Sequence, residues 1–264
     1  MSEMKEYAPG TFCWAELVAD DSDRAKEFYS KLFGWNFADV PIGDGKVYSM
    51  ASVNGKDAGA MYQMWSEQKE QGVPTHWASY VSVSNVDESV KEAQSLGGGM
   101  IVGPMDVFDA GRLALILDPT GAAVSLWQPS KHIGARVVNE HGTLCWNELL
   151  TNDTGKAGAF YTGLFGWTAN EQDMGGMLYT VFMNGERPAA GMMKIDKSWG
   201  DVPSNWLVYF AVNDCDGCAA EAGSLGGEIL NGPMDIPGVG RFAVMIDPQG
   251  AVFAVIKLER VYTG

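Results

Sequence analysis

The chain contains the same sequence twice. Residues 10–35 read GTFCWAELVADDSDRAKEFYSKLFGW and residues 142–167 read GTLCWNELLTNDTGKAGAFYTGLFGW, with 14 of 26 positions identical and no gap. A spacing of about 130 residues is too long for a solenoid repeat and suits duplication of a whole domain. The match continues along both copies, where VPTHWASYVSV (73–83) aligns with VPSNWLVYFAV (202–212) and DPTGA (118–122) with DPQGA (247–251).

Three segments follow from the duplication. We expect a first domain over residues 8–129, a polar linker over 130–141 and a second domain over 142–260. The linker contains two of the three histidines, His132 and His141, and we expect both side chains in solvent. Whether such a chain is a monomer or a homodimer stays open, because a tandem duplication can supply what two single-domain subunits would.

Each copy is itself built from one unit used twice. In the first copy a strand pattern at 12–18 precedes a helix pattern at 22–33, whose apolar residues recur at helical spacing. Asp21 or Ser22 can cap this helix and Gly34 can end it. Three strand patterns follow at 35–40, 46–53 and 57–64, and the same order recurs at 76–83, 86–96, 100–106, 112–117 and 122–128. The sequence therefore predicts an α+β protein made of four β-α-β-β-β modules.

Composition narrows the classes of partner. Hydrophobic residues make up 46% of the chain and charged residues 19%, so a substantial core is expected. The net charge of −15 argues against nucleic acid and anionic membranes as partners, because both require basic surfaces. The polar segment Met1–Gly10 does not resemble a secretory signal, and no apolar run approaches the ~18 residues of a membrane span. We expect a cytoplasmic protein.

Paired modules with FY…LFGW on the first helix and DPxG before the last strand resemble the vicinal oxygen chelate superfamily. That superfamily includes glyoxalases, bleomycin-resistance proteins and extradiol dioxygenases. Within it the chain is similar to tandem two-domain, glyoxalase-like proteins of actinobacteria, some of which are labelled hydroxylases. The resemblance implies that two modules curl into one mostly antiparallel sheet with a concave cup, while helices cover the outer face. In metal-dependent members a divalent ion lies at the base of the cup.

Alternation along the strands predicts which side chains face each cup. In the first strand Leu17 and Ala19 should face the helix, so the residues that alternate with them, Trp14, Glu16 and Val18, should face the cup. The cup of the first domain should then contain Trp14, Glu16, Val18, His76, Ala78, Tyr80, Ala123, Ser125 and Trp127. The cup of the second should contain Trp146, Glu148, Leu150, Asn205, Leu207, Tyr209, Ala211, Val252, Ala254 and Ile256.

The metal ligands of the family are His, Glu or Gln at set positions of the first and last strands. The resemblance places these positions on Trp14, Ala78, Ser125, Trp146, Leu207 and Ala254. None of these side chains is a good ligand for a catalytic divalent metal. We therefore expect no cofactor, with an atypical divalent site as the alternative.

The candidate catalytic residues are Glu16 and Glu148, each two residues after a tryptophan on an otherwise apolar strand. A carboxyl in an apolar cup has a raised pKa, which suits a general acid or base. The alternative is a structural carboxylate paired with backbone N–H groups or with Arg112 or Arg241.

The candidate ligand-binding residues are mainly aromatic. Tryptophan and tyrosine side chains in a cup would form a stacking surface for a flat ligand, although core packing is the commoner use of such residues. His76, which aligns with Asn205, could be a lone base or could form hydrogen bonds at the rim. The set comprises Trp14, His76, Tyr80, Trp127, Trp146, Asn205 and Tyr209.

These features support three hypotheses for function. The leading one is a protein that binds a small hydrophobic or aromatic metabolite in a metal-free cup, as bleomycin-resistance members sequester antibiotics. The second is an enzyme of secondary metabolism or aldehyde detoxification. Such a lyase, isomerase or oxygenase-like enzyme would use Glu16 and Glu148 as acid and base or would hold an unusual metal. The third is an interaction protein that keeps the fold without a pocket.

Overall fold

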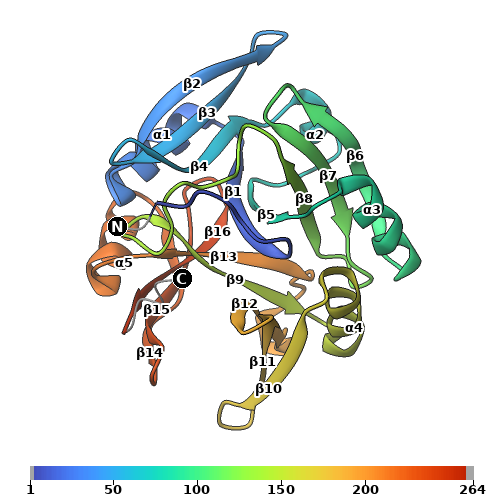
Figure 1. Cartoon of the computed structure of the whole chain (residues 1–264). Helices are drawn as coiled ribbons and strands as arrows, with labels where there is room; N and C mark the ends of the chain where they lie inside the picture. The colour runs from blue at the N-terminus through green and yellow to red at the C-terminus, as the bar shows by residue number, and fades with distance from the viewer. Residues whose placement is uncertain (1–2, 260–264) are drawn as a thin grey trace.

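The computed structural model describes residues 3–259 and contains two eight-stranded sheets, one from each half of the chain (Figure 1). The order of the first sheet is β2-β3-β4-β1-β5-β8-β7-β6, and the second repeats it as β10-β11-β12-β9-β13-β16-β15-β14. The first comprises β1 (Thr11–Ala19), β2 (Asn36–Gly43), β3 (Lys46–Val53), β4 (Lys56–Gln63), β5 (His76–Ser82), β6 (Gly99–Val107), β7 (Gly111–Leu117) and β8 (Ala123–Pro129). The second comprises β9 (Thr143–Thr151), β10 (Thr168–Asp173), β11 (Leu178–Asn184), β12 (Arg187–Lys194), β13 (Asn205–Ala211), β14 (Glu228–Ile236), β15 (Gly240–Ile246) and β16 (Val252–Leu258).

One long helix follows the first strand of each module, as the sequence predicts. These helices are α1 (Ser22–Phe33), α3 (Val86–Ser95), α4 (Thr154–Phe165) and α5 (Cys215–Ser224). The Asp21 side chain accepts a hydrogen bond from the Arg24 backbone N–H at 3.0 Å and so caps α1, and Gly34 ends it with a φ of 71°. Sequence analysis missed α2 (Ser66–Glu70) and the 3₁₀ helix η1 (Lys197–Trp199), which are too short to show an apolar stripe. Among residues 3–259 no helix is long and apolar enough to cross a membrane.

The first strand of each domain lies in the middle of its sheet. β1 runs antiparallel to β5 and parallel to β4, and β9 has the same relation to β13 and β12. Eight of the nine residues of β1 are buried, because neighbouring strands flank it and both faces of the sheet are covered. The four-module α+β fold predicted from the sequence is confirmed.

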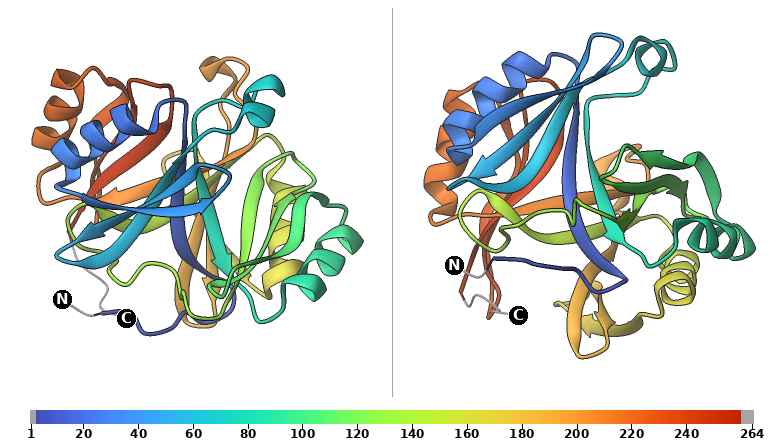
Figure 2. Two further views of the ribbon diagram at one scale, coloured as in Figure 1. Left: turned by 90° about the horizontal axis from the view of Figure 1, so that it is seen from above. Right: turned by 45° about the horizontal axis from the view of Figure 1, so that its top comes forward.

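The outer faces of the two sheets share their hydrophobic cores. One core joins α1 of the first domain to α5 of the second, and the other joins α3 to α4 (Figure 2). Phe33 of α1, for example, contacts Phe210 of β13, with ring centroids 5.1 Å apart. Each half of the chain therefore completes the core of the other half.

Two repeated motifs provide polar contacts across this boundary. The Tyr29 hydroxyl of FY donates to Asp247 Oδ2 of DPQG at 3.0 Å and accepts from Trp77 Nε1. The tryptophan of LFGW also crosses between domains, because Trp35 Nε1 donates to the Gly142 carbonyl at 2.7 Å. Its counterpart, Trp167, donates to the Gly10 carbonyl at 2.9 Å. The motifs that carry the family resemblance thus hold the two domains together.

Candidate functional site

We call the face of each sheet that points away from the helices its inner face. Glu16 lies on the first inner face between Ala60 and Ala78 of the adjacent strands, and its side chain is 8% exposed. Glu148 lies on the second between Gly191 and Leu207, and is 7% exposed. The neighbours of both carboxyls across the strands are small or apolar, so water contributes little to their solvation.

Tyrosine hydroxyls supply polar partners for the two buried carboxyls. Tyr80 donates to Glu16 Oε1 at 2.8 Å, and Tyr209 donates to Glu148 Oε1 at 3.1 Å. Each carboxyl therefore lies beside a tyrosine that the sequence had placed on the same face.

A second tyrosine completes each cluster. Tyr48 and Tyr179 lie beside Glu16 and Glu148 respectively, and their hydroxyls act to lower the pKa of these carboxyls. Their hydroxyls accept the indole N–H of Trp14 at 3.0 Å and of Trp146 at 3.2 Å. Sequence reasoning missed both tyrosines, although they occupy matching places in the repeat, in KVYSM and MLYTV. We call Trp14, Glu16, Tyr48 and Tyr80 the first carboxyl cluster, and Trp146, Glu148, Tyr179 and Tyr209 the second.

Burial dominates the acid–base properties of the clusters. It raises the pKa of Glu16 and of Glu148 above the ordinary 4.5, and the tyrosine hydrogen bonds oppose this rise only in part. Burial and the neighbouring carboxyl raise the pKa of Tyr80 and Tyr209 in turn. Each cluster therefore favours the protonated carboxyl more than a glutamate in water does.

The proposed pairing of these glutamates with arginine is wrong. Arg112 Nε donates to Asp87 at 2.7 Å and its Nη1 donates to Asp106 at 2.8 Å. Arg241 makes the equivalent pairs with Asp216 and Asp235. Each arginine is the second residue of the strand that follows a hairpin turn. There it pairs with one carboxylate of the adjacent strand and one of the preceding helix.

The first inner face is covered by the chain itself. The Ala135 backbone N–H donates to the Cys13 carbonyl at 2.8 Å, and Trp127 Nε1 donates to the His132 carbonyl at 2.8 Å. From the N-terminal segment, the Tyr7 hydroxyl donates to the Ala135 carbonyl at 2.6 Å. The linker and the segment around Tyr7 thus pack into one apolar cluster with Trp14, Tyr80 and Trp127.

The expectation that the His132 side chain lies in solvent is therefore corrected. The His132 ring lies edge-on to Trp14, with centroids 4.8 Å apart, and burial lowers its pKa. Ala135 and Val137 are fully buried, which the polar composition of the linker did not indicate. His141 is exposed, as expected.

The second inner face is more accessible within the part of the chain that the structure describes. Among the described residues, its apolar cluster consists of strand residues, which include Leu207, Tyr209, Ala254 and Ile256. Cys145, Trp146 and Leu150 are partly exposed, whereas their counterparts Cys13, Trp14 and Val18 are buried. The two inner faces thus have the same cluster of a carboxyl, two tyrosines and a tryptophan, and they differ in how far their residues are exposed to solvent.

The remaining predicted residues lie outside the clusters. His76 Nδ1 is 2.8 Å from the Pro74 carbonyl oxygen, and Asn205 Nδ2 donates to the Pro203 carbonyl at 2.8 Å. The two side chains thus occupy equivalent places at the start of β5 and β13 and bind local backbone. Trp127 is 7% exposed beneath the linker, and Ile256 takes its place in the second domain.

The side chains of the inner faces do not fit a divalent metal. Trp14 and Trp146 offer only an indole N–H, and Ala78, Leu207 and Ala254 offer no donor atom. Within residues 3–259, no three His, Cys, Asp or Glu side chains come together in a group that could hold a metal ion. Each cluster provides one carboxyl, and tyrosine hydroxyls already bind it.

The paired modules and the repeated motifs match a known family. The model of the "Glyoxalase/Bleomycin resistance protein/Dioxygenase superfamily" matches residues 11–126 and again 140–255. The chain belongs to this superfamily. Its membership agrees with the fold, and the two matches agree with the tandem architecture.

Relatives cover the whole length of the chain. The protein named "Putative glyoxylase CFP32" of Mycobacterium tuberculosis is 45% identical over 259 residues, which are 97% of this chain and 98% of that protein. The anthracycline biosynthesis protein DnrV of Streptomyces peucetius is 34% identical over 269 residues, which are 98% of this chain and 97% of that protein.

Solved structures support the fold. A Mn(II)-bound glyoxalase from Novosphingobium aromaticivorans superposes with a TM-score of 0.67 at 14% identity, covering 99% of this chain and 85% of that one. A homoprotocatechuate 2,3-dioxygenase variant from B. fuscum superposes with a TM-score of 0.66 at 16% identity, covering 98% of this chain and 75% of that one.

Proposed function

We propose that the second domain binds a small aromatic or hydrophobic metabolite on its inner face without a metal ion. The observation that carries this proposal is the second carboxyl cluster. A buried carboxyl, Glu148, is held by Tyr209 among apolar residues on a face that the linker does not cover. Small-molecule sites commonly combine an apolar lining with a few polar groups that orient the ligand.

Aromatic side chains favour a flat ligand. Trp146, Tyr179 and Phe242 are partly exposed around the cluster and offer ring surfaces for stacking. Relatives named for anthracycline biosynthesis support this class, because anthracyclines are flat polycyclic aromatics. In our proposal the Glu148 carboxyl, in its protonated form, donates one orienting hydrogen bond to an oxygen of the ligand.

The first domain then has a different role. Its inner face has the same cluster, but the linker occupies the space beside Trp14 and Trp127. We propose that this domain supports the fold by completing the two shared cores, while the second domain holds the ligand.

Tryptophan fluorescence tests the proposal. We expect 1,4-dihydroxyanthraquinone, a flat aromatic probe, to quench the fluorescence in a saturable way. The Trp146→Phe variant should lose most of this quenching, because it removes the tryptophan beside the ligand. Trp14→Phe is the matched control, because Trp14 occupies the equivalent position beneath the linker, and this variant should retain the quenching. Equal quenching of both variants, or no saturable quenching of the wild type, would contradict the proposal.

An acid–base enzyme is the second candidate, and the raised pKa of Glu148 favours it. A carboxyl with a raised pKa keeps its proton to a higher pH than a glutamate in water and can give it to a ligand atom or take it back. The glyoxylase name of one relative points to aldehyde substrates. Glu148→Gln should then abolish turnover of a reactive aldehyde such as methylglyoxal while binding persists, and Glu16→Gln should leave turnover intact. Absence of turnover in the wild type across such aldehydes excludes this candidate.

A further inference from the structure

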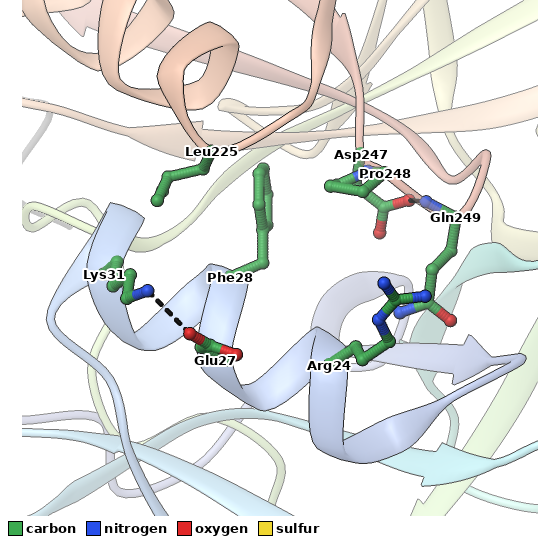
Figure 3. Close-up of a pocket in the computed structure, with 8 residues that line it drawn as sticks. All are labelled: Arg24, Glu27, Phe28, Lys31, Leu225, Asp247, Pro248 and Gln249. Carbon is green, nitrogen blue, oxygen red and sulfur yellow. Dashed lines mark hydrogen bonds and ion pairs between the residues drawn. The ribbon is translucent and has the colours of Figure 1, made fainter.

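A cavity of about 250 Å³ lies where the first domain meets the second, on the side of the sheets that carries the helices (Figure 3). One wall is α1 and the other combines the end of α5 with the turn between β15 and β16. Its lining residues are Arg24, Glu27, Phe28, Lys31, Leu225, Asp247, Pro248 and Gln249. The cavity belongs to neither inner face.

The cavity has an apolar middle and polar ends. The Phe28 ring, 5% exposed, stands between Leu225 and Pro248 (Figure 3). Lys31 lies toward one end, and Arg24 lies toward the other beneath Gln249 (Figure 3). A ligand there would meet an apolar surface bordered by two cations, Arg24 and Lys31, and by the carboxyl groups of Glu27 and Asp247.

Most polar groups of the cavity already have protein partners. Lys31 Nζ is 2.6 Å from Glu27 Oε1, and the Gln249 amide exchanges two hydrogen bonds with the Asp21 backbone. Asp247 Oδ2 accepts from Tyr29, and its Oδ1 accepts from backbone N–H groups of its own turn. Arg24 is different, because its exposed side chain forms no ion pair within 4.0 Å with any residue from 3 to 259, although its charge contributes to the lowered pKa of Glu27.

The equivalent boundary on the other side of the molecule is tightly packed. Gly163 of α4 occupies the place of Lys31, and a Cβ added there would lie 3.0 Å from the Leu96 side chain. Phe160, the counterpart of Phe28, packs so closely on Gly98 that a Cβ at that glycine would come within 2.7 Å of its ring. Phe28, Leu225 and their counterparts are the same residues in both repeats, whereas Lys31 aligns with Gly163, so the cavity is not an inevitable result of the fold.

We propose that this cavity is a binding site for a small organic carboxylate. The guanidinium of Arg24 matches a carboxylate in planar, bidentate geometry, while Phe28, Leu225 and Pro248 contact the apolar body of the ligand. The volume lies just below the ~300–1,000 Å³ typical of small-molecule sites, so the ligand is no larger than a single substituted ring. Because the ligand contacts both domains, it stabilises their association.

Calorimetric titration of the full chain with benzoate tests the proposal. We expect saturable binding with a Kd below about 10 mM, and an affinity for benzamide, which lacks the charge, at least about tenfold lower. Arg24→Gln should weaken benzoate binding at least about tenfold. Lys156→Gln is the matched control, because Lys156 is the counterpart of Arg24 at the tightly packed boundary, and it should leave the Kd unchanged.

Several results would overturn the proposal. One is that benzoate does not bind saturably. Another is that the wild type and Arg24→Gln bind benzoate with equal affinity, and a third is that the wild type binds benzoate and benzamide equally well. Inorganic phosphate that binds as tightly as benzoate would show that the apolar wall contributes nothing and that the ligand class is wrong. Loss of benzoate binding in Glu148→Gln, with retention in Arg24→Gln, would place the ligand on the second inner face instead.

Discussion

Glu16 and Glu148 show how the surroundings of one residue type set its chemistry. Both are glutamates on a central strand, and among residues 3–259 no cationic side chain pairs with either. Uncharged tyrosine hydroxyls hold them, so desolvation outweighs stabilisation of the anion and the pKa is raised. The repetition of this arrangement in both domains shows that it is a property of the module.

The raised pKa predicts how stability depends on pH. A carboxyl whose folded pKa exceeds its unfolded value contributes stability that is fully present below the unfolded value, near 4.5, and is lost as the pH rises through the folded value. Glutamine cannot ionise. The double variant Glu16→Gln/Glu148→Gln should therefore gain stability relative to the wild type as pH rises from about 4.5 to 7.5, by about 1.4 kcal/mol for each pH unit that separates a folded from an unfolded pKa.

Urea unfolding at several pH values measures this gain. Glu27→Gln is the control, because the pKa of this exposed glutamate is lowered, chiefly by its hydrogen bond to Lys31. Its stability contribution is present above the unfolded pKa, so the control should show no gain as pH rises. A double variant that follows the wild type at every pH would contradict the raised pKa of the two carboxyls.

The repeated elements match closely, and the linker after β8 adds a cover to the first of the two inner faces. After β8 the chain crosses the first inner face, and Gly134 makes this course feasible. Its φ is 107°, and a Cβ there would lie 2.3 Å from the Cys13 carbonyl oxygen. A larger residue at this position would separate the linker from β1.

We predict that Gly134→Ala destabilises the chain and uncovers the first inner face. Backbone strain alone costs about 1–3 kcal/mol, and the contact with Cys13 adds to it. Gly121→Ala is the control, since Gly121 has a φ of 97° but no atom near the added Cβ, so it should show the strain alone. Hydrogen exchange should accelerate at Ala135 and Arg136 in Gly134→Ala only. Unchanged exchange at both amides would show that the linker does not depend on this glycine.

The two domains form one folding unit because each hydrophobic core draws residues from both halves of the chain. Polar contacts between Tyr29 and Asp247, and between Trp35 and Gly142, join the same surfaces. Separation of the domains would expose aromatic rings and leave buried polar groups without partners. We therefore expect unfolding of the whole molecule to be cooperative.

Tyr29→Phe tests this view of the whole molecule. The substitution leaves Asp247 Oδ2 without the Tyr29 donor and Trp77 Nε1 without its acceptor, which should cost about 1–3 kcal/mol. Calorimetry should show one transition at a lower Tm. Tyr62→Phe is the control, because the Tyr62 hydroxyl accepts a hydrogen bond from the part-buried Gln68 amide within its own domain. This variant should lower the Tm by less. Two separated transitions in Tyr29→Phe would show that the domains unfold independently.

The amino-acid sequence determined the duplication, the order of strands and helices, the fold class and the inward direction of Glu16, Tyr80, Glu148 and Tyr209. These features follow from local periodicity and capping, which a single copy of the repeat already expresses.

Only the tertiary structure decided which groups meet across long distances. It placed Tyr48 and Tyr179 on the two carboxyls, assigned Arg112 and Arg241 to aspartates, and laid the linker over the first inner face. The physical reason is that a strand pattern specifies a face and not its neighbours. The partners of a buried carboxyl, and the segment that covers an apolar surface, depend on strand order and on packing between residues far apart in the chain.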